Sequence, residues 1–514
     1  MSKMFETECE KLEHLVIPSD MMANIEDDIP MDIFSEDIKI KLNKAAKLLK
    51  EGEVVAIPTE TVYGLAGNAL DKNVVPKIFK AKNRPSDNPL IVHISSLKML
   101  KQLLPNGEIP KNYIPVIHKY WPGPLTIILP KSSKVPDVVT GGQQTMAVRF
   151  PKHPIARALI SLCGFPLAAP SANSSGKPSP TLASHVYNDL FGKIPLIIDG
   201  GACNLGVEST VIDGIRNPPA ILRPGSVTYE MLKIVPGMEK IQVYRRDFVD
   251  KSLEQVPTTP GMKYRHYSPD AEVILIESNV NSTEESYQKM KKAIEERNAE
   301  IIKNSIDTNT TKVIDKNGKS LKEINKISKE QYILEEQYKE ISKLKTVAEK
   351  QNKIIEQEME KIMKNNENNE NNENNNIKIS KKIGILRSQS IETWKKNQHI
   401  LGGEREGEGD NNNNDEIETP SNKKIKISKD KSQSISNLKF INNNSKCIEW
   451  EGHIEYFMGD RENPADIARE LFKALRFVDK LNVSTIFVEG IEDVNEGLAI
   501  MNRIRKASSK IIKY

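Results

Sequence analysis

Short apolar runs alternate with helical patterns over the first half of the chain. Runs of four to six residues, rich in β-branched side chains and ended by turn residues, predict buried strands at 54–58, 90–94, 125–129, 145–149, 196–199 and 209–213. Apolar side chains at helical spacing predict a helix through Ile40 and Leu49, and a proline just inside its start predicts another over 154–162. These elements predict a mixed α/β domain over residues 38–249, a usual size for one domain.

The same alternation returns at 271–514 and predicts a second, smaller α/β domain. Strands are expected at 273–276, 383–386 and 483–488, a helix from Pro464 with an apolar face, and a last helix from Leu498. Two low-complexity inserts, 279–380 and 388–446, interrupt this region. The Asn/Glu repeat at 365–376 predicts disorder. Between Leu334 and Ile362 apolar residues recur mainly every three or four positions. This spacing predicts a weak coiled coil or, preferably, a solvated transient helix.

Composition limits the classes of protein to which this chain can belong. The 514 residues carry 74 Lys and Arg against 70 Asp and Glu, so bulk charge does not predict nucleic-acid binding. Four scattered cysteines disfavour a disulfide scaffold or a zinc site, and no apolar run is long enough for a transmembrane helix. Residues 1–37 hold eleven acidic and two basic residues, which predicts an acidic disordered arm and not a transit peptide. The expected location is the cytoplasm.

Three loops carry candidate phosphate chemistry. Lys80, Lys82 and Arg84 stand in a proline-constrained turn, which is either a phosphate site or a solvated basic loop. The Ser/Gly-rich stretch 171–181 follows an apolar run, and the Gly-rich stretch 200–210 leads into a strand. Such loops let backbone N–H groups approach an anion, although an ordinary turn explains each of them when taken alone.

Two strand residues complete the candidate chemistry. Arg149 ends an apolar strand, and a buried arginine needs an anionic partner, which is either a structural carboxylate or a ligand carboxylate. His93 lies within an apolar strand, where a histidine is more often a core residue than a catalyst. The sequence contains no spacing typical of a nucleophilic triad. Cations, hydroxyls and backbone amides together favour nucleotide binding and phosphoryl or nucleotidyl transfer.

Six motifs occur in the order that characterises one family. They are 59–65, 82–93, 121–126, 147–151, 171–176 and 206–210. Together they resemble the YrdC-type threonylcarbamoyl-AMP synthase family. Residues 260–269 are similar to the linker of its long, two-domain form, and 464–469 with 499–503 to the C-terminal domain of that form. The resemblance implies a twisted mixed-sheet domain with a concave cavity, followed by a Rossmann-like domain.

The resemblance also implies a reaction. L-Threonine, bicarbonate or CO2, and ATP would give threonylcarbamoyl-AMP and pyrophosphate. A partner transferase complex would then modify adenosine 37 of tRNAs that read codons beginning with A. Magnesium is expected with ATP, held mostly by substrate oxygens because no dedicated carboxylate cluster is evident. Residues 250–270 would form a linker whose His266 and Tyr267 close over ATP as a lid.

The site residues follow from the matching motifs. Those implied for L-threonine are Thr61, His93, Arg149, Ala169 and Ser209. Those implied for ATP are Lys82, Arg84, Asn88, Thr145, Ser171, Asn173, Ser179, Arg223, His266 and Tyr267, with Lys82 and Arg84 as the catalytic cations.

Two alternatives stay open. A non-catalytic module that binds double-stranded RNA in the cavity is disfavoured by the mild net charge. A related enzyme that uses carbamoyl phosphate would need zinc-finger cysteines that this chain lacks. The C-terminal domain could also be a dock for tRNA or a partner protein.

Overall fold

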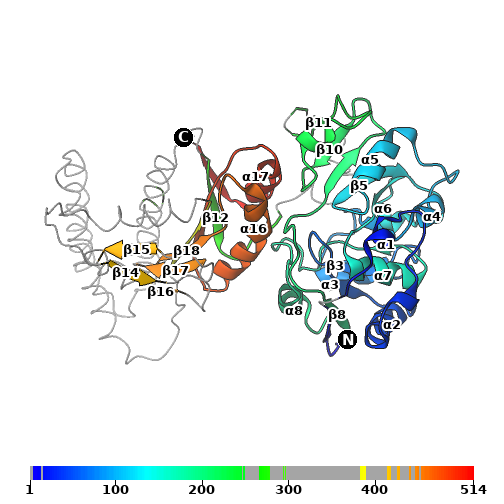
Figure 1. Cartoon of the computed structure of the whole chain (residues 1–514), viewed down its shortest axis with the longest axis horizontal. Helices are drawn as coiled ribbons and strands as arrows, with labels where there is room; N and C mark the ends of the chain where they lie inside the picture. Colours follow the sequence, from blue (N-terminus) through cyan, green and yellow to red (C-terminus); the bar gives the residue numbers. More distant parts are fainter. Residues whose placement is uncertain are drawn as a thin grey trace, which may run out of the picture. The chain divides into compact units, whose positions relative to one another are not determined.

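The structure is a computed structural model and is shown in Figure 1. It describes residues 4–12, 15–245, 247–248, 250, 266–277, 382–388, 446–450 and 453–513, positions 293 and 296, and three short strands between 414 and 440. Residues 1–290 and 382–514 form one compact unit, and 291–381 form another. The predicted helix at 334–362, the Asn/Glu repeat and linker residues 251–265 lie outside the described residues.

An eleven-stranded mixed sheet organises the first domain. All six strands predicted there are present, which confirms the predicted fold class. In spatial order the strands are β1 (Glu8–Lys11), β8 (Leu196–Asp199), β2 (Val55–Ile57), β3 (Gly64–Asn68), β7 (Leu167–Ala168), β4 (Ile91–His93), β6 (Thr145–Arg149), β5 (Leu125–Pro130), β9 (Thr210–Asp213), β10 (Ala220–Arg223) and β11 (Gln242–Val243).

The helices of this domain bury apolar stripes against the sheet and each other. α2 (Glu36–Lys50) buries Leu42, Ala45 and Leu49 and packs on α7 (Pro154–Cys163), which ends at Gly164 with a φ of 75°. α3 (Val75–Lys82) ends at Asn83, whose φ is 52°. The other helices are α1 (Ser19–Ala23), η1 (Met31–Ile33), α4 (Leu97–Lys101), η2 (Lys111–Tyr113), α5 (Ile114–Tyr120), α6 (Asp137–Thr140), α8 (Ala183–Leu190) and α9 (Tyr229–Leu232).

The N-terminal segment is part of the fold, so the prediction of a disordered arm over 1–37 is wrong for its described residues. β1 pairs in parallel with β8 at the sheet edge. Five apolar side chains of the segment are buried in the main core: Leu12, Leu15, Ile17, Ile29 and Phe34. Lys44 on α2 contacts Glu8 at 2.6 Å and Glu10 at 2.7 Å, so part of the acidic charge is paired. A few well-placed apolar residues outweigh an acidic composition, because burial of each contributes roughly 1.5–3 kcal/mol.

A seven-stranded sheet organises the C-terminal domain, as the alternation at the chain end predicts. Its spatial order is β16 (Lys439–Phe440), β17 (Cys447–Trp450), β18 (His453–Phe457), β13 (Ile383–Arg387), β19 (Thr485–Glu489), β12 (Glu272–Glu277) and β20 (Lys510–Lys513). The strands from β18 to β20 run parallel, with α16 (Pro464–Asp479) and α17 (Glu496–Ala507) packed on them. In Figure 1 the green β12 lies among the orange and red elements.

The insert predicted at 388–446 has a different boundary in the structure. Ser388 is fully buried, and its backbone N–H donates to the Glu489 carboxylate at 3.0 Å. β16 joins the main sheet, and β14 (Asn414–Ile417) pairs with β15 (Ile425–Ser428) in a two-stranded sheet. Ser388 therefore belongs to the domain core, and the stretch contains regular strands.

Two first-domain loops reach the core of the C-terminal domain. Val62 and Val207 cluster with Tyr267 and with the apolar faces of α16 and α17. The loops that follow β2 and precede β9 are thereby held between the domains. In the described part of the chain, no helix has the length and apolarity needed to cross a membrane.

Candidate functional site

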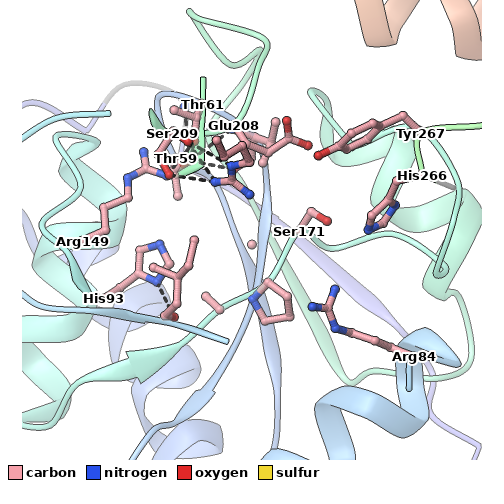
Figure 2. Close-up of a pocket in the computed structure, with 16 residues that line it drawn as sticks. Thr59, Thr61, Arg84, His93, Arg149, Ser171, Glu208, Ser209, His266 and Tyr267 are labelled. Carbon is pink, nitrogen blue, oxygen red and sulfur yellow. Dashed lines mark hydrogen bonds between the residues drawn. The ribbon is translucent and has the colours of Figure 1, made fainter. Parts of the chain in front are cut away.

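Several of these loops and strand ends converge on one pocket of the first domain. Arg149 and His93 lie at one end, and Arg84 and His266 at the other (Figure 2). The predicted site residues that line it are Thr61, Arg84, His93, Arg149, Ala169, Ser171, Ser209, Arg223, His266 and Tyr267. Most of the implied site is therefore brought together in space.

Arg149 is held at the end of β6 by the loop after β2. Its Nη1 donates to Thr61 Oγ1 at 2.8 Å, and its Nη2 to Glu60 Oε1 at 2.6 Å. Its Nε donates to the Gly123 carbonyl at 3.3 Å. A guanidinium has five N–H donors, so these contacts leave one on each terminal nitrogen. The sequence left open whether the anionic partner of Arg149 is a structural carboxylate or a ligand carboxylate. Glu60 is the structural carboxylate, and Arg149 also keeps donors for a ligand carboxylate.

Glu60 is a residue that the sequence reasoning missed. Its second oxygen accepts hydrogen bonds from the backbone N–H groups of Lys152 and His153, each at 3.1 Å. Burial alone would raise the pKa of Glu60, but the Arg149 charge and these hydrogen bonds hold it below the usual value. The carboxylate therefore stays ionised and fixes the orientation of Arg149.

Two hydroxyls and a second arginine form the neighbouring wall. Ser209 Oγ lies 2.8 Å from Thr126 Oγ1, and Arg223 Nη2 donates to Ser209 Oγ at 3.1 Å. Arg223 also donates from Nε to the Ser209 carbonyl at 3.1 Å. These contacts place hydroxyl and guanidinium groups beside Arg149 without a charged nucleophile. The arrangement is suited to binding a small polar substrate.

The far end of the pocket has buried polar atoms without partners. Arg84 donates from Nη2 to the Pro89 carbonyl at 3.4 Å, but its Nε has no hydrogen-bond partner among the described residues. Asn88 Oδ1 is also buried without a partner among the described residues, but Asn88 is not among the residues that line the pocket. Burial lowers the pKa of Arg84 to about 10, so it remains a cation at neutral pH. An unsatisfied buried donor such as Arg84 Nε is costly unless a ligand completes it.

Lys82, Asn173 and Ser179 support the pocket from behind, and none of the three is among its lining residues. Lys82 Nζ donates to the Asn173 carbonyl at 2.6 Å and also to the Ser171 carbonyl. Asn173 Nδ2 donates to the Lys177 carbonyl at 2.9 Å, and Ser179 Oγ donates to Glu208. Burial, helped by the Arg84 charge, sets the pKa of Lys82 well below its usual value. These side chains hold the 171–179 loop in place.

Thr145 lies at the opposite end of β6 from Arg149. It begins β6 opposite Pro130, whereas Arg149 ends the same strand at the pocket. Four residues of strand separate the two positions by roughly 13 Å. Thr145 is not among the pocket-lining residues, and its predicted contact with ATP stays a prediction.

His266 and Tyr267 cover the Arg84 end. Their rings stack with centroids 4.8 Å apart, and the Tyr267 ring also packs 5.2 Å from Phe472 on α16. The backbone N–H of His266 donates to the Lys506 carbonyl at 3.3 Å, so both residues contact the C-terminal domain. Tyr267 has a φ of 67°, the left-handed conformation that turns its ring into the pocket (Figure 2).

The described residues contain no group of three or more His, Cys, Asp or Glu side chains that could hold a metal ion. The acidic residues nearest the pocket are paired with arginines: Glu60 with Arg149 and Glu208 with Arg503. The described side chains therefore do not fit a resident metal. The expectation that magnesium accompanies ATP stays a prediction.

Buried histidines make the stability of the fold dependent on pH. Burial lowers the pKa values of His93, His185 and His266 from 6.5 to about 3. Below pH 6.5 the unfolded chain binds protons that these folded side chains reject, so the free energy of unfolding falls as the pH drops. With three such groups the slope approaches about 4 kcal/mol per pH unit near pH 5. We expect urea unfolding midpoints to decrease from pH 7 to pH 5.

A matched variant separates the histidines from other groups. His185→Gln removes a buried imidazole that accepts only the Thr181 N–H, at 3.2 Å, and lies outside the pocket. It should reduce the slope between pH 7 and pH 5 by about 1.4 kcal/mol per pH unit. A wild-type stability that is flat over this range would contradict the prediction.

Comparison with known proteins agrees with this arrangement. A family model of the Sua5, YciO and YrdC proteins, described as "Telomere recombination", matches residues 47–225. A second, described as "Threonylcarbamoyl-AMP synthase, C-terminal domain", matches residues 227–509, more than half of the chain.

Curated relatives point in the same direction. The threonylcarbamoyl-AMP synthase of Schizosaccharomyces pombe is 52% identical over 266 residues, 47% of this chain and 64% of that protein. The match thus spans slightly less than two thirds of that relative. The threonylcarbamoyl-AMP synthase of Pyrococcus abyssi is 53% identical over 242 residues, 47% of this chain and 69% of that protein.

A solved structure extends the similarity to both domains. The crystal structure of P. abyssi Sua5 complexed with L-threonine is 33% identical and has a TM-score of 0.60. It covers 96% of this chain and 98% of that one. The chain therefore belongs to the Sua5/YrdC family of threonylcarbamoyl-AMP synthases, in the form that carries the C-terminal domain.

Proposed function

We propose that the pocket joins L-threonine, CO2 or bicarbonate, and ATP into L-threonylcarbamoyladenylate, with release of pyrophosphate. The observation that carries the proposal is a single pocket with two cationic ends, Arg149 at one and Arg84 at the other. A substrate carboxylate and a triphosphate both need such groups, and one shared pocket lets the two substrates react. The P. abyssi relative crystallised with L-threonine supports this choice of amino acid.

The Arg149 end is assigned to threonine. The two remaining N–H donors of Arg149 would hold the carboxylate, with Thr61 and Ser209 hydroxyls beside it. His93 Nδ1 donates to the Ile91 carbonyl at 3.1 Å, and its low pKa keeps the ring neutral at physiological pH. A neutral ring adds no charge to a site that must accept a zwitterion. The side-chain methyl would face Ala169, which offers only modest selection against serine.

The Arg84 end is assigned to ATP. Its unsatisfied Nε is a donor that a bound triphosphate would complete, whereas Asn88 is not among the lining residues and its contact with ATP stays a prediction. Ser171 and Arg223 line the space between Arg84 and Arg149, where the α-phosphate must lie for reaction. Lys82 supports the Ser171 turn from behind, and its direct contact with phosphate stays a prediction.

The reaction balances without a covalent enzyme intermediate. The threonine amine attacks the CO2 carbon, forms an N–C bond and loses a proton to solvent, which gives a carbamate. A carbamate oxygen then attacks the α-phosphorus, forms an O–P bond and displaces pyrophosphate. The cations of the pocket would stabilise the charge that builds on the phosphate oxygens. Magnesium, carried in with the triphosphate, would neutralise part of that charge.

The product would supply a tRNA-modifying partner. The mixed anhydride between carbamate and AMP is prone to hydrolysis, so the covered site and direct transfer to a threonylcarbamoyl transferase complex both protect it. We place the protein among nucleotidyltransferases because an adenylyl group passes to the carbamate oxygen. The cytoplasm, where ATP and tRNA are abundant, is the proposed location.

One assay tests the proposal directly. Purified protein receives ATP, magnesium, labelled bicarbonate and one amino acid at a time, and the label in an adenylate is measured together with pyrophosphate. We expect label with L-threonine and little with other amino acids. A protein that releases no pyrophosphate but binds double-stranded RNA with steep salt dependence would favour the RNA-binding alternative.

The lid makes a separate prediction. Replacing both His266 and Tyr267 with alanine removes two stacked rings over the Arg84 end, so ATP is held less well and water enters. The KM for ATP should rise about tenfold, the size expected for lost stacking and packing contacts. Pyrophosphate release measured against ATP concentration checks this, with Phe191→Ala as an exposed aromatic control. An unchanged KM for ATP would show that His266 and Tyr267 do not act as a lid.

A further inference from the structure

The segment 204–209 is shared between the pocket and the C-terminal domain. Gly206 has a φ of 73°, and a Cβ there would lie 2.4 Å from the Arg469 Cα and 2.5 Å from the Ala468 carbonyl. Arg469 Nε donates to the Asn204 carbonyl at 2.9 Å. The backbone of α16 therefore rests directly on this turn, and only glycine leaves room for it.

Neighbouring residues of the segment serve different domains. Val207 is fully buried and packs in the core of the C-terminal domain. Ser209 lines the pocket, and its carbonyl and hydroxyl are bonded to Arg223. Glu208, between them, also lines the pocket. The position of this pocket wall thus depends on how the C-terminal helices hold the segment.

Arg503 of α17 reaches from the C-terminal domain to Glu208. It has no exposed surface, and its Nε donates to Glu208 Oε2 at 2.9 Å. The other Glu208 oxygen accepts from Ser179 Oγ. Arg503 Nη1 also donates to the Pro224 carbonyl, and its guanidinium lies 5.9 Å from the Tyr267 ring centroid. One side chain therefore touches the pocket wall, the Arg223 loop and the lid.

The charge of Glu208 makes this contact functional. Figure 2 shows Glu208 on the pocket wall beside Ser209, facing Tyr267. Burial would raise the pKa of Glu208, but the charges of Arg503 and Arg223 hold it below the usual value, so the side chain is a carboxylate. An uncompensated carboxylate in this position would repel a triphosphate, and buried charges left without partners are strongly unfavourable.

We propose that Arg503 is a positioning residue for the ATP site, supplied by the C-terminal domain, which neutralises Glu208 and holds segment 204–209 against the pocket. This rests on the proposed function. In this way the C-terminal domain contributes to the ATP site of the first domain. If α17 moved away from Glu208, the Glu208 carboxylate would face the nucleotide without its Arg503 partner. Arg503 itself is not among the residues that line the pocket, so we expect it to act on the nucleotide only through Glu208 and the segment.

Steady-state pyrophosphate release, with ATP and threonine varied separately, tests the proposal. Arg503→Met should raise the KM for ATP roughly tenfold, the size expected for one uncompensated charge acting a few ångströms from a triphosphate. The KM for threonine should change much less. Adding Glu208→Gln to Arg503→Met removes the unpaired charge, so the KM for ATP should return most of the way to the wild-type value. A merely structural role for Arg503 would not give this rescue.

Arg505→Met is the matched control. Arg505 lies on the same helix and pairs with Glu277 and Asp493, away from the pocket, so its loss should leave the KM for ATP unchanged. If Arg503→Met yields no folded protein, Arg503→Gln keeps a donor to Glu208 without the charge and should show the same increase.

An unchanged KM for ATP in Arg503→Met or in Arg503→Gln would overturn the proposal. So would a double variant whose KM for ATP is as high as that of Arg503→Met. Wild-type protein that releases no pyrophosphate with threonine would instead overturn the proposed function. The two failures are therefore distinguishable.

Discussion

Arg149→Ala should reduce kcat/KM for threonine by about 100- to 1000-fold in pyrophosphate release. The change removes the cation assigned to the substrate carboxylate. It also leaves Glu60 buried, ionised and without the guanidinium that now contacts it at 2.6 Å. Both effects act on threonine, because an anion at the Arg149 end would then repel the substrate carboxylate.

The two effects can be separated by variants. Arg149→Lys keeps a positive charge beside Glu60 but loses the planar fork, so it should recover only part of the activity. Threonine binding measured by calorimetry should follow the same order as the kinetics. Arg216→Ala, which breaks a partly exposed pair with Asp250 at 3.4 Å, is the control and should behave as the wild type. Turnover near the wild-type level in Arg149→Ala would refute the carboxylate clamp.

The fold was predictable where side-chain pattern decides structure. The strand at 145–149 has the predicted bounds, and the helix expected over 154–162 runs from Pro154 to Cys163. The N-terminal segment was not predictable from its composition. Counting charges hides the few apolar residues that bury it, and the pairing of β1 with β8 joins positions nearly 190 residues apart in sequence.

The site was predictable as a set of residues but not as a network of charges. Family motifs identified Arg84, Arg149 and Ser209, which do line the pocket. They gave no role to Glu60 or Glu208, because an acid beside an anion site is unfavourable unless an arginine pairs with it, and sequence does not show that pairing. The partner of Glu208 is Arg503, which only the docking of the C-terminal domain brings near. For Thr145 the strand was predicted correctly, while its contact with ATP stays a prediction.

Arg84→Met should have the opposite substrate signature from Arg149→Ala. Methionine keeps the apolar part of the buried side chain and removes the Nε donor and charge assigned to the triphosphate. We expect the KM for ATP to rise about a hundredfold, equivalent to losing one charge-assisted contact of ~2.7 kcal/mol. Threonine binding without ATP should be close to that of the wild type, since Arg84 lies at the far end of the pocket from Arg149.

Lys80→Met provides the control that distinguishes a placed guanidinium from general positive charge. Lys80 belongs to the same basic turn and carries the same charge, but it is exposed on α3 and does not line the pocket. Bulk attraction of ATP to the turn would make the two variants equally poor and would weaken with added salt. A placed contact predicts a large effect only for Arg84. Because Arg84 is almost entirely shielded from solvent, that effect should also persist at high ionic strength.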